Sequence, residues 1–135
     1  MTRWSKVSLS GALEEALEKR KGQAKLELSL PWNADEIAGV LKDIFERDGV
    51  KVLEVLYEPT EATRRVFAVW GVYRGKEIMA YVEGELKGNR YVTSKVTVYR
   101  YRNVIPWGVI REYFVPIYKD RKAIEEAKRL GEVTV

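Results

Sequence analysis

The stretch that decides the fold lies between Thr63 and Arg102 and reads TRRVFAVWGVYRGKEIMAYVEGELKGNRYVTSKVTVYRYR. Two short breaks, Arg74-Gly75 and Gly88-Asn89, divide it into segments rich in Val, Tyr and Thr, residues that favour strands. Gly and Asn adopt the positive φ angles that tight hairpin turns require. Closely spaced strands joined by such turns form an antiparallel meander. We therefore expect strands at 63–73, 76–86 and 90–102.

Two more strands are expected earlier in the chain. From Ala24 to Leu30 apolar and polar residues alternate, which predicts a half-buried strand. The apolar-rich run from Val50 to Glu58 predicts another. Within the meander, Val66 to Val72 is apolar on both faces. This strand should therefore lie in the centre of the sheet and be covered on both sides.

Helices flank these strands. The clearest helix start is Trp32-Asn33-Ala34-Asp35-Glu36-Ile37, because Asn33 can cap the first turn while Trp32 packs on Ile37. Apolar residues then recur with helical period until Asp48-Gly49. Further helices are predicted at 10–21, at 106–114, where a strand is the competing interpretation, and at 121–130. The fold class that follows is α+β: an antiparallel sheet of about four to five strands with helices packed mostly on one face.

The composition excludes several kinds of chemistry. The chain of 135 residues has no Cys and no His, which removes disulfides, thiolate nucleophiles, cysteine zinc sites and the commonest general base. It also has no Walker loop, no GxGxxG and no GxSxG motif. We therefore expect one domain spanning 1–135 that is not an enzyme and that uses no cofactor and no metal.

Composition also indicates where such a protein works. Lys, Arg and Glu are abundant while Asn, Gln and Met are scarce, which is typical of a thermophile. Hydrophobic residues make up 46% of the chain and charged residues 33%, as in a globular protein. No apolar run has the length of a membrane span. A soluble, cytoplasmic protein without a membrane partner is expected.

Positive charge and aromatic residues coincide between Lys87 and Lys122. Nine Lys/Arg face two acids in this segment, a balance of +7, so the rest of the chain carries −3 of the total of +4. Seven of the fifteen aromatic residues lie there as well. Cations neutralise phosphates, and unstacked bases lie on aromatic rings whatever their sequence. The coincidence points to a groove for single-stranded nucleic acid.

The last strand of the meander supplies the candidate site. In a regular strand, alternate residues share a face, which here groups Tyr91, Thr93, Lys95, Thr97, Tyr99 and Tyr101. The hypothesis is that four rings stack bases and four cations contact phosphates: Tyr91, Tyr99, Tyr101 and Trp107, and Lys95, Arg100, Arg102 and Arg111. Tyr81 on the preceding strand could extend this surface, but its neighbours Glu77, Glu83 and Glu85 should repel phosphate.

Other interpretations of the same residues stay open. Tyr and Thr occupy solvent-facing strand positions in many proteins through β-propensity alone, with Lys and Arg as edge charges. The rings could equally form a protein-interaction patch or line a small-ligand pocket. Salt separates nucleic-acid binding from protein interaction, because phosphate binding weakens steeply with salt.

As a whole the chain resembles the ThermoDBP single-stranded DNA-binding proteins of hyperthermophilic archaea. The shared features are a domain free of His and Cys, the capped helix start at 32–37, a meander, and the basic and aromatic segment from Tyr91 to Trp107. The resemblance implies binding of single-stranded DNA in a cleft lined by aromatic and basic residues, without an OB fold. It leaves open whether the ligand is DNA or RNA, how many nucleotides are bound and whether the protein forms homo-oligomers.

Overall fold

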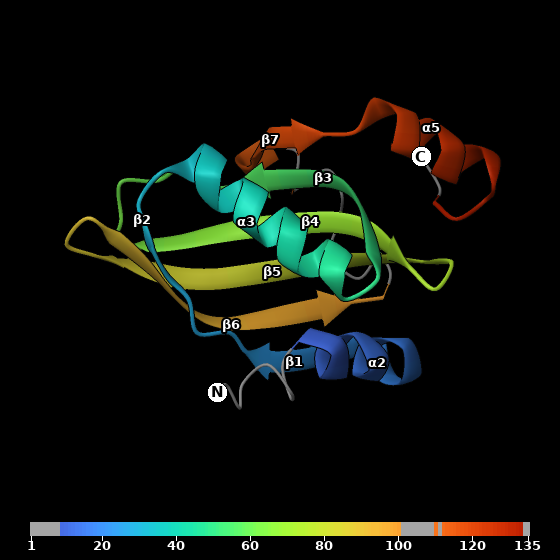
Figure 1. Ribbon diagram of the computed structural model, residues 1–135, viewed down its shortest axis with the longest axis horizontal. Helices are drawn as coiled ribbons and strands as arrows, with labels where there is room; N and C mark the ends of the chain where they lie inside the picture. The colour runs from blue at the N-terminus through green and yellow to red at the C-terminus, as the bar shows by residue number, and fades with distance from the viewer. Residues whose placement is uncertain (1–8, 101–109, 111, 134–135) are drawn as a thin grey trace.

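A computed structural model describes residues 9–100, 110 and 112–133 (Figure 1). With the labels of Figure 1, the elements in chain order are α2 (Leu9–Lys19), β1 (Lys21–Lys25), β2 (Ser29–Pro31), α3 (Ala34–Arg47), β3 (Val50–Tyr57), β4 (Arg64–Tyr73), β5 (Lys76–Lys87), β6 (Arg90–Tyr99), β7 (Val115–Lys119) and α5 (Arg121–Arg129). The strands form one seven-stranded antiparallel sheet in the order β1-β6-β5-β4-β3-β7, and β2 pairs with β6 beside β1. The predicted α+β class and the antiparallel meander are confirmed.

The sheet has more strands than the sequence predicted, for two reasons. The expected strand at 24–30 is divided into β1 and β2. Between them the side chain of Thr93 replaces part of the ladder: its hydroxyl accepts from the Leu28 N–H at 2.8 Å and donates to the Leu26 carbonyl. β7 was not predicted, because Pro116 suggested only the end of a helix. At the edge of the sheet, the missing N–H of a proline leaves no ladder bond broken.

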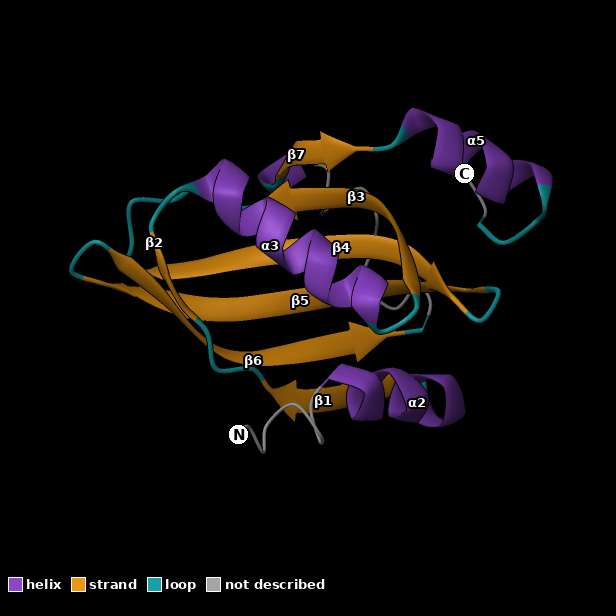
Figure 2. Ribbon diagram, in the orientation of Figure 1, coloured by secondary structure: helices purple, strands orange, loops and turns teal. Residues whose placement is uncertain are grey.

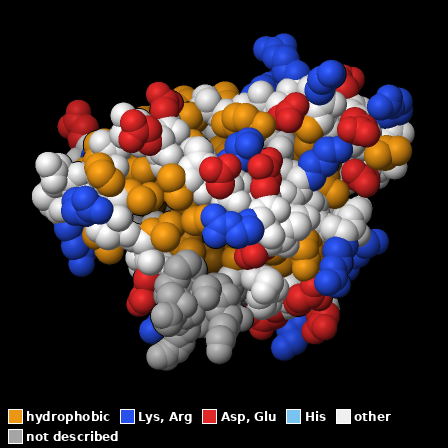
Figure 3. Space-filling model, viewed as in Figure 1, with side chains coloured by type: hydrophobic (Ala, Val, Ile, Leu, Met, Phe, Trp, Pro, Cys, Tyr) orange, Lys and Arg blue, Asp and Glu red, His pale blue; other side chains and the backbone are white. Residues whose placement is uncertain are grey.

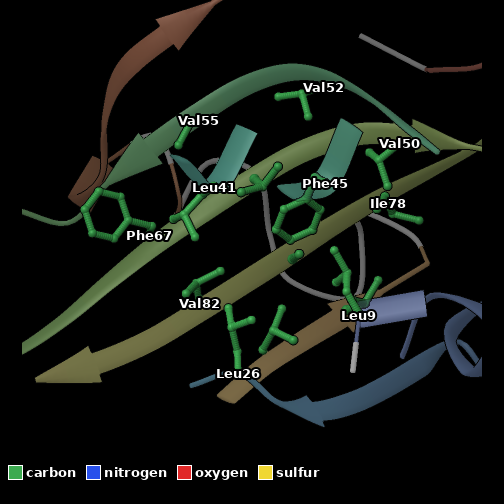
Figure 4. Close-up of a cluster of buried hydrophobic side chains, with 14 of the residues drawn as sticks. Leu9, Leu26, Leu41, Phe45, Val50, Val52, Val55, Phe67, Ile78 and Val82 are labelled. Carbon is green, nitrogen blue, oxygen red and sulfur yellow. The ribbon is translucent and has the colours of Figure 1, made fainter. Parts of the chain in front are cut away.

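One side of the sheet, which we call the α3 face, is covered by α2 and α3 (Figure 2). Asn33 caps α3 as predicted, its side chain accepting a hydrogen bond from the Glu36 N–H at 3.0 Å. Figure 4 shows Leu41 and Phe45 of α3 directed at the sheet. Their fully buried neighbours in this core include Val52, Val55, Phe67, Ile78 and Val82.

The opposite side, the α5 face, has a smaller core. Ala123, Ile124 and Ala127 of α5 pack there with Ile110 and Val133 against Leu53, Leu56, Ala68, Trp70, Val72 and Met79. β4 is therefore buried on both faces, as its sequence predicted. α5 lies at the β3 and β7 side of the sheet (Figure 1). Among the described residues, no helix is long and apolar enough to cross a membrane.

A β-bulge in β6 decides which of its side chains share a face. Glu83 pairs with Lys95 and Gly84 pairs with Thr93, so Ser94 is an extra residue in β6. A one-residue insertion moves every side chain beyond it to the other face. Thr93 and Tyr91 consequently lie on the α3 face, whereas Lys95 and Tyr99 lie on the α5 face. The expectation that alternation from Tyr91 to Tyr99 is unbroken was wrong.

Candidate nucleic-acid interface

The outer part of the α5 face brings together side chains from β1, β6 and β5. Residues directly opposite each other on antiparallel strands share a face. In neighbouring rungs, Tyr99 lies between Lys21 and Met79, Thr97 between Gln23 and Tyr81, and Lys95 between Lys25 and Glu83. We call the rings and lysines gathered here the ring-and-lysine surface: Lys21, Lys25, Tyr81, Lys95, Tyr99 and Phe114.

Three aromatic rings form the centre of this surface. The centroids of Tyr81 and Tyr99 are 5.9 Å apart with their planes at 68°, an edge-to-face contact. Phe114 lies on the other side of Tyr81, with centroids 6.2 Å apart. All three are half-buried, so each ring keeps some exposed surface. Burial, and then the neighbouring Tyr99, raise the pKa of the Tyr81 hydroxyl above its ordinary value.

Lysines flank the rings on the side of β1. The Lys21 ammonium lies 5.8 Å from the centroid of the Tyr99 ring, within the range of a cation–π contact. Lys25 and Lys95 are directly opposite each other and both are exposed. Like charges in opposite positions of two strands destabilise the pair. An anion bound beside them would relieve this repulsion.

Two of the three acidic neighbours that argued against Tyr81, Glu77 and Glu83, are engaged within the protein. Glu77 accepts a hydrogen bond from the Trp70 indole N–H at 2.7 Å. Glu83 accepts a short hydrogen bond from the Arg64 guanidinium, and one of its oxygens is 3.9 Å from the Lys95 ammonium. Both carboxylates are thus held by donors instead of facing the rings unpaired.

The structure places two of the predicted site residues on this surface and two elsewhere. Lys95 and Tyr99 belong to the ring-and-lysine surface. Tyr91 is completely buried in the α3 core, its hydroxyl donates to the Arg65 carbonyl at 3.0 Å, and burial raises its pKa. Stacking of bases on Tyr91 is therefore a wrong prediction, and the bulge at Ser94 is the reason.

Arg100 is also directed away from the rings. Its guanidinium donates to the Leu17 carbonyl of α2 at 3.3 Å, and its backbone N–H donates to the Arg20 carbonyl. We therefore leave it out of the surface. The remaining predicted residues, Tyr101, Arg102, Trp107 and Arg111, lie outside the described residues.

Sequence reasoning missed two lysines and one ring. Lys21 was assigned to the C-terminus of the first helix, but Arg20 has φ of 71° and ends it, so Lys21 starts β1. The signal was present, since Lys21, Gln23 and Lys25 extend the period-2 pattern backward. Phe114 could not have been found in this way, because it reaches Tyr81 from a distant segment of the chain.

Comparison with known proteins identifies no family model, no curated protein and no solved structure that matches this chain.

Within residues 9–100, 110 and 112–133, no group of three or more Asp or Glu side chains is placed to hold a metal ion. Charges of both signs are interspersed on the side that carries α3 (Figure 3). Aromatic rings and lysines instead gather on the α5 face.

Proposed function

We propose that this protein binds single-stranded DNA through the ring-and-lysine surface, without strong sequence preference. The observation that supports this most is the contact between the half-buried rings of Tyr81 and Tyr99, with Lys21 beside Tyr99. Bases without a stacking partner lie on such rings, and each stacked base contributes about 1–3 kcal/mol. The lysines beside the rings neutralise phosphates of the same strand.

A single strand suits this surface better than a duplex does. The bases of a duplex are already stacked on one another, so rings on a sheet face gain nothing from them. The resemblance to ThermoDBP proteins predicts the same ligand and the same kind of site, and it stays a prediction. In this proposal the protein is a non-enzymatic binding protein that needs no cofactor. RNA offers the same rings and phosphates, so it belongs in the first binding assay.

Substitution of single tyrosines tests the proposal. Tyr99→Ala and Tyr81→Ala should each weaken binding of a labelled oligo(dT) about tenfold, measured by fluorescence anisotropy. Tyr118→Ala is the matched control, because Tyr118 is also half-buried and also has a lysine near its ring, Lys42 at 5.2 Å. Tyr118 pairs through β7 with Val55 of the α3 core, so it lies on the other side of the sheet. Equal losses in all three variants would contradict the assignment of the site.

A protein-interaction surface is the second candidate function. Tyr113 and Val115, the neighbours of Phe114, have exposed fractions of 58% and 46%. Exposed aromatic side chains such as Tyr113 are enriched at the centre of protein interfaces. An interface between proteins would bind no oligo(dT), and concentration-dependent light scattering at high salt would show self-association of the chain.

A further inference from the structure

Glu83 lies where two cations of different strands converge. The Arg64 guanidinium from β4 donates to one carboxylate oxygen, and the Lys95 ammonium from β6 is 3.9 Å from the other. The exposed fractions of these two cationic side chains are 67% and 47%, so a ligand can reach both. The Glu83 side chain itself is only 21% exposed, which indicates that it lies between them.

The surroundings of this carboxylate carry an excess of positive charge. Beyond Arg64 and Lys95, Lys25 is opposite Lys95, and Lys87 lines a hollow of about 250 Å³ next to Glu83. Glu85, opposite Arg64, is the other acid of this hollow. The charge of Glu58 also acts on Arg64, so four cations share three carboxylates. Ser94, the extra residue of the bulge, lines this hollow together with Glu83.

The position also fits a strand that stacks on Tyr81. Glu83 follows Tyr81 by two residues on the same face of β5, which is roughly 7 Å along the strand. That spacing is comparable to the length of one extended nucleotide. A base on the Tyr81 ring would thus bring an adjoining phosphate close to the position of the Glu83 carboxylate. Arginine binds carboxylates and phosphates with the same planar fork of donors.

We propose that Glu83 is a built-in phosphate mimic: its carboxylate occupies an anion site formed by Arg64 and Lys95, and a phosphate of the bound strand displaces it. This inference rests on the proposed binding of single-stranded DNA and adds a regulating residue to it. Each binding event must break the two contacts of Glu83. The residue therefore lowers affinity, and it keeps the two cations paired in the free protein.

Removing the charge of Glu83 should strengthen binding. Glu83→Gln should bind oligo(dT) about two- to fivefold more tightly than the wild type, the equivalent of one exposed ion pair. Glu46→Gln is the matched control, because it removes one acid and one lysine contact, Lys42 at 3.1 Å, from α3. It should leave affinity unchanged, and the gain should vanish when Arg64→Gln and Lys95→Gln are added.

Inorganic pyrophosphate separates this inference from the proposed function. We expect the backbone amide signals of Gly84 and Ser94 to shift in NMR titrations of Glu83→Gln at lower pyrophosphate concentration than in the wild type. If Glu83→Gln binds pyrophosphate no better than the wild type, the phosphate-mimic proposal is overturned, whatever oligo(dT) does. A gain with pyrophosphate while neither form binds oligo(dT) supports the anion site, and only the proposed function then fails. Melting curves of Glu83→Gln and Glu46→Gln show whether these two variants are folded.

Discussion

At the scale of single residues, Gly84 shows how tightly β5 is packed against β6. A Cβ atom at this position would lie 2.6 Å from the Val92 carbonyl oxygen and 2.8 Å from Cζ of Tyr91. Real Cβ atoms do not approach backbone oxygens so closely. The glycine therefore leaves the space that the buried Tyr91 ring occupies next to the bulge.

The first prediction compares this glycine with another. Gly84→Ala should lower the free energy of unfolding by about 1–3 kcal/mol, because overpacking forces neighbours out of place. Gly39→Ala should raise it by roughly 0.5–1 kcal/mol, since Gly39 lies exposed inside α3 with nothing within 4 Å of its Cβ position. Urea unfolding monitored by circular dichroism measures both. Similar effects of the two substitutions would mean that Gly84 does not pack as described.

The second prediction concerns Asp48 at the C-terminus of α3. Burial raises the pKa of its carboxyl above the ordinary value of 3.8, and Arg47 only partly opposes this. A negative charge at the C-terminal end of a helix is also unfavourable. Because the folded pKa lies above the unfolded one, the ionised group destabilises the fold at neutral pH, and this cost disappears as the pH falls below the unfolded value.

Asp48→Asn should therefore stabilise the protein by about 0.3–1 kcal/mol at pH 7, and the gain should fade below about pH 4. Thermal melts at several pH values measure the difference from the wild type. Asp43→Asn removes the same charge from the exposed side of α3 and serves as the control. A gain of the same size at low and at neutral pH would refute the assignment to the Asp48 charge.

Residue by residue, the candidate site could be predicted only in part. Lys95 and Tyr99 were identified because their strand has a clear alternating pattern beyond the bulge. Tyr91 was misplaced because the extra residue is Ser94, and nothing in the sequence of β6 marks it. The cause is in the neighbouring strands: Thr93 bonds to the segment between β1 and β2, and Gly84 makes room for Tyr91.

At the scale of elements, the start of α3 is fixed by a cluster of aromatic rings. This cluster is larger than the predicted contact between Trp32 and Ile37. The Trp32 ring has its centroid 5.6 Å from Tyr57 and 5.8 Å from Tyr91. The Arg65 guanidinium lies 5.0 Å from the Trp32 ring. Contacts with β3, β4 and β6 thus anchor the turn between β2 and α3, and Trp32 also belongs to the α3 core with Ile37.

The third prediction separates structural from binding aromatics. Trp32→Ala should lower the free energy of unfolding by about 2–4 kcal/mol, because it leaves a cavity among the rings of the α3 face. The affinity for oligo(dT) should stay the same, since Trp32 is on the other side of the sheet from Tyr99. Tyr113→Ala, which removes a ring with an exposed fraction of 58%, should change stability little. If Trp32→Ala weakened binding without affecting melting, the binding surface would lie at α3.

The element pattern itself was largely predictable, and its exceptions share a cause. The four strands from β3 to β6 and the helices α2, α3 and α5 follow from local periodicity, turns and caps. β7 and the division between β1 and β2 depend on partners far away in the chain: β7 exists because β3 offers it a free edge. The sequence of β7 is short and contains a proline, so it gives no local indication of a strand. Its pairing with β3 therefore determines its structure.

At the scale of the whole molecule, net charge alone says little about binding. The chain carries +4, and the sequence places +7 between 87 and 122 against −3 in the rest of the chain. The fold redistributes these charges. Lys21 and Lys25 from the first strand join Lys95, whereas Arg100 turns to α2. The positive region that matters is therefore assembled across the sheet from segments that are distant in sequence.

The last prediction follows from that assembly. If Lys21, Lys25, Lys95 and Arg64 each contact one phosphate, the logarithm of the binding constant for oligo(dT) should fall against the logarithm of salt concentration with a slope of roughly −3, from about −0.7 per contact. Between about 50 and 200 mM salt this is a loss of roughly 50-fold. Lys21→Gln and Lys25→Gln should each make the slope less steep by about 0.7, while Lys42→Gln on α3 should not change it. Duplex of equal length should bind more weakly at every salt concentration, because its bases cannot reach Tyr81 and Tyr99. A slope near zero would mean that oligo(dT) binds without phosphate contacts, which would contradict the role of the lysines.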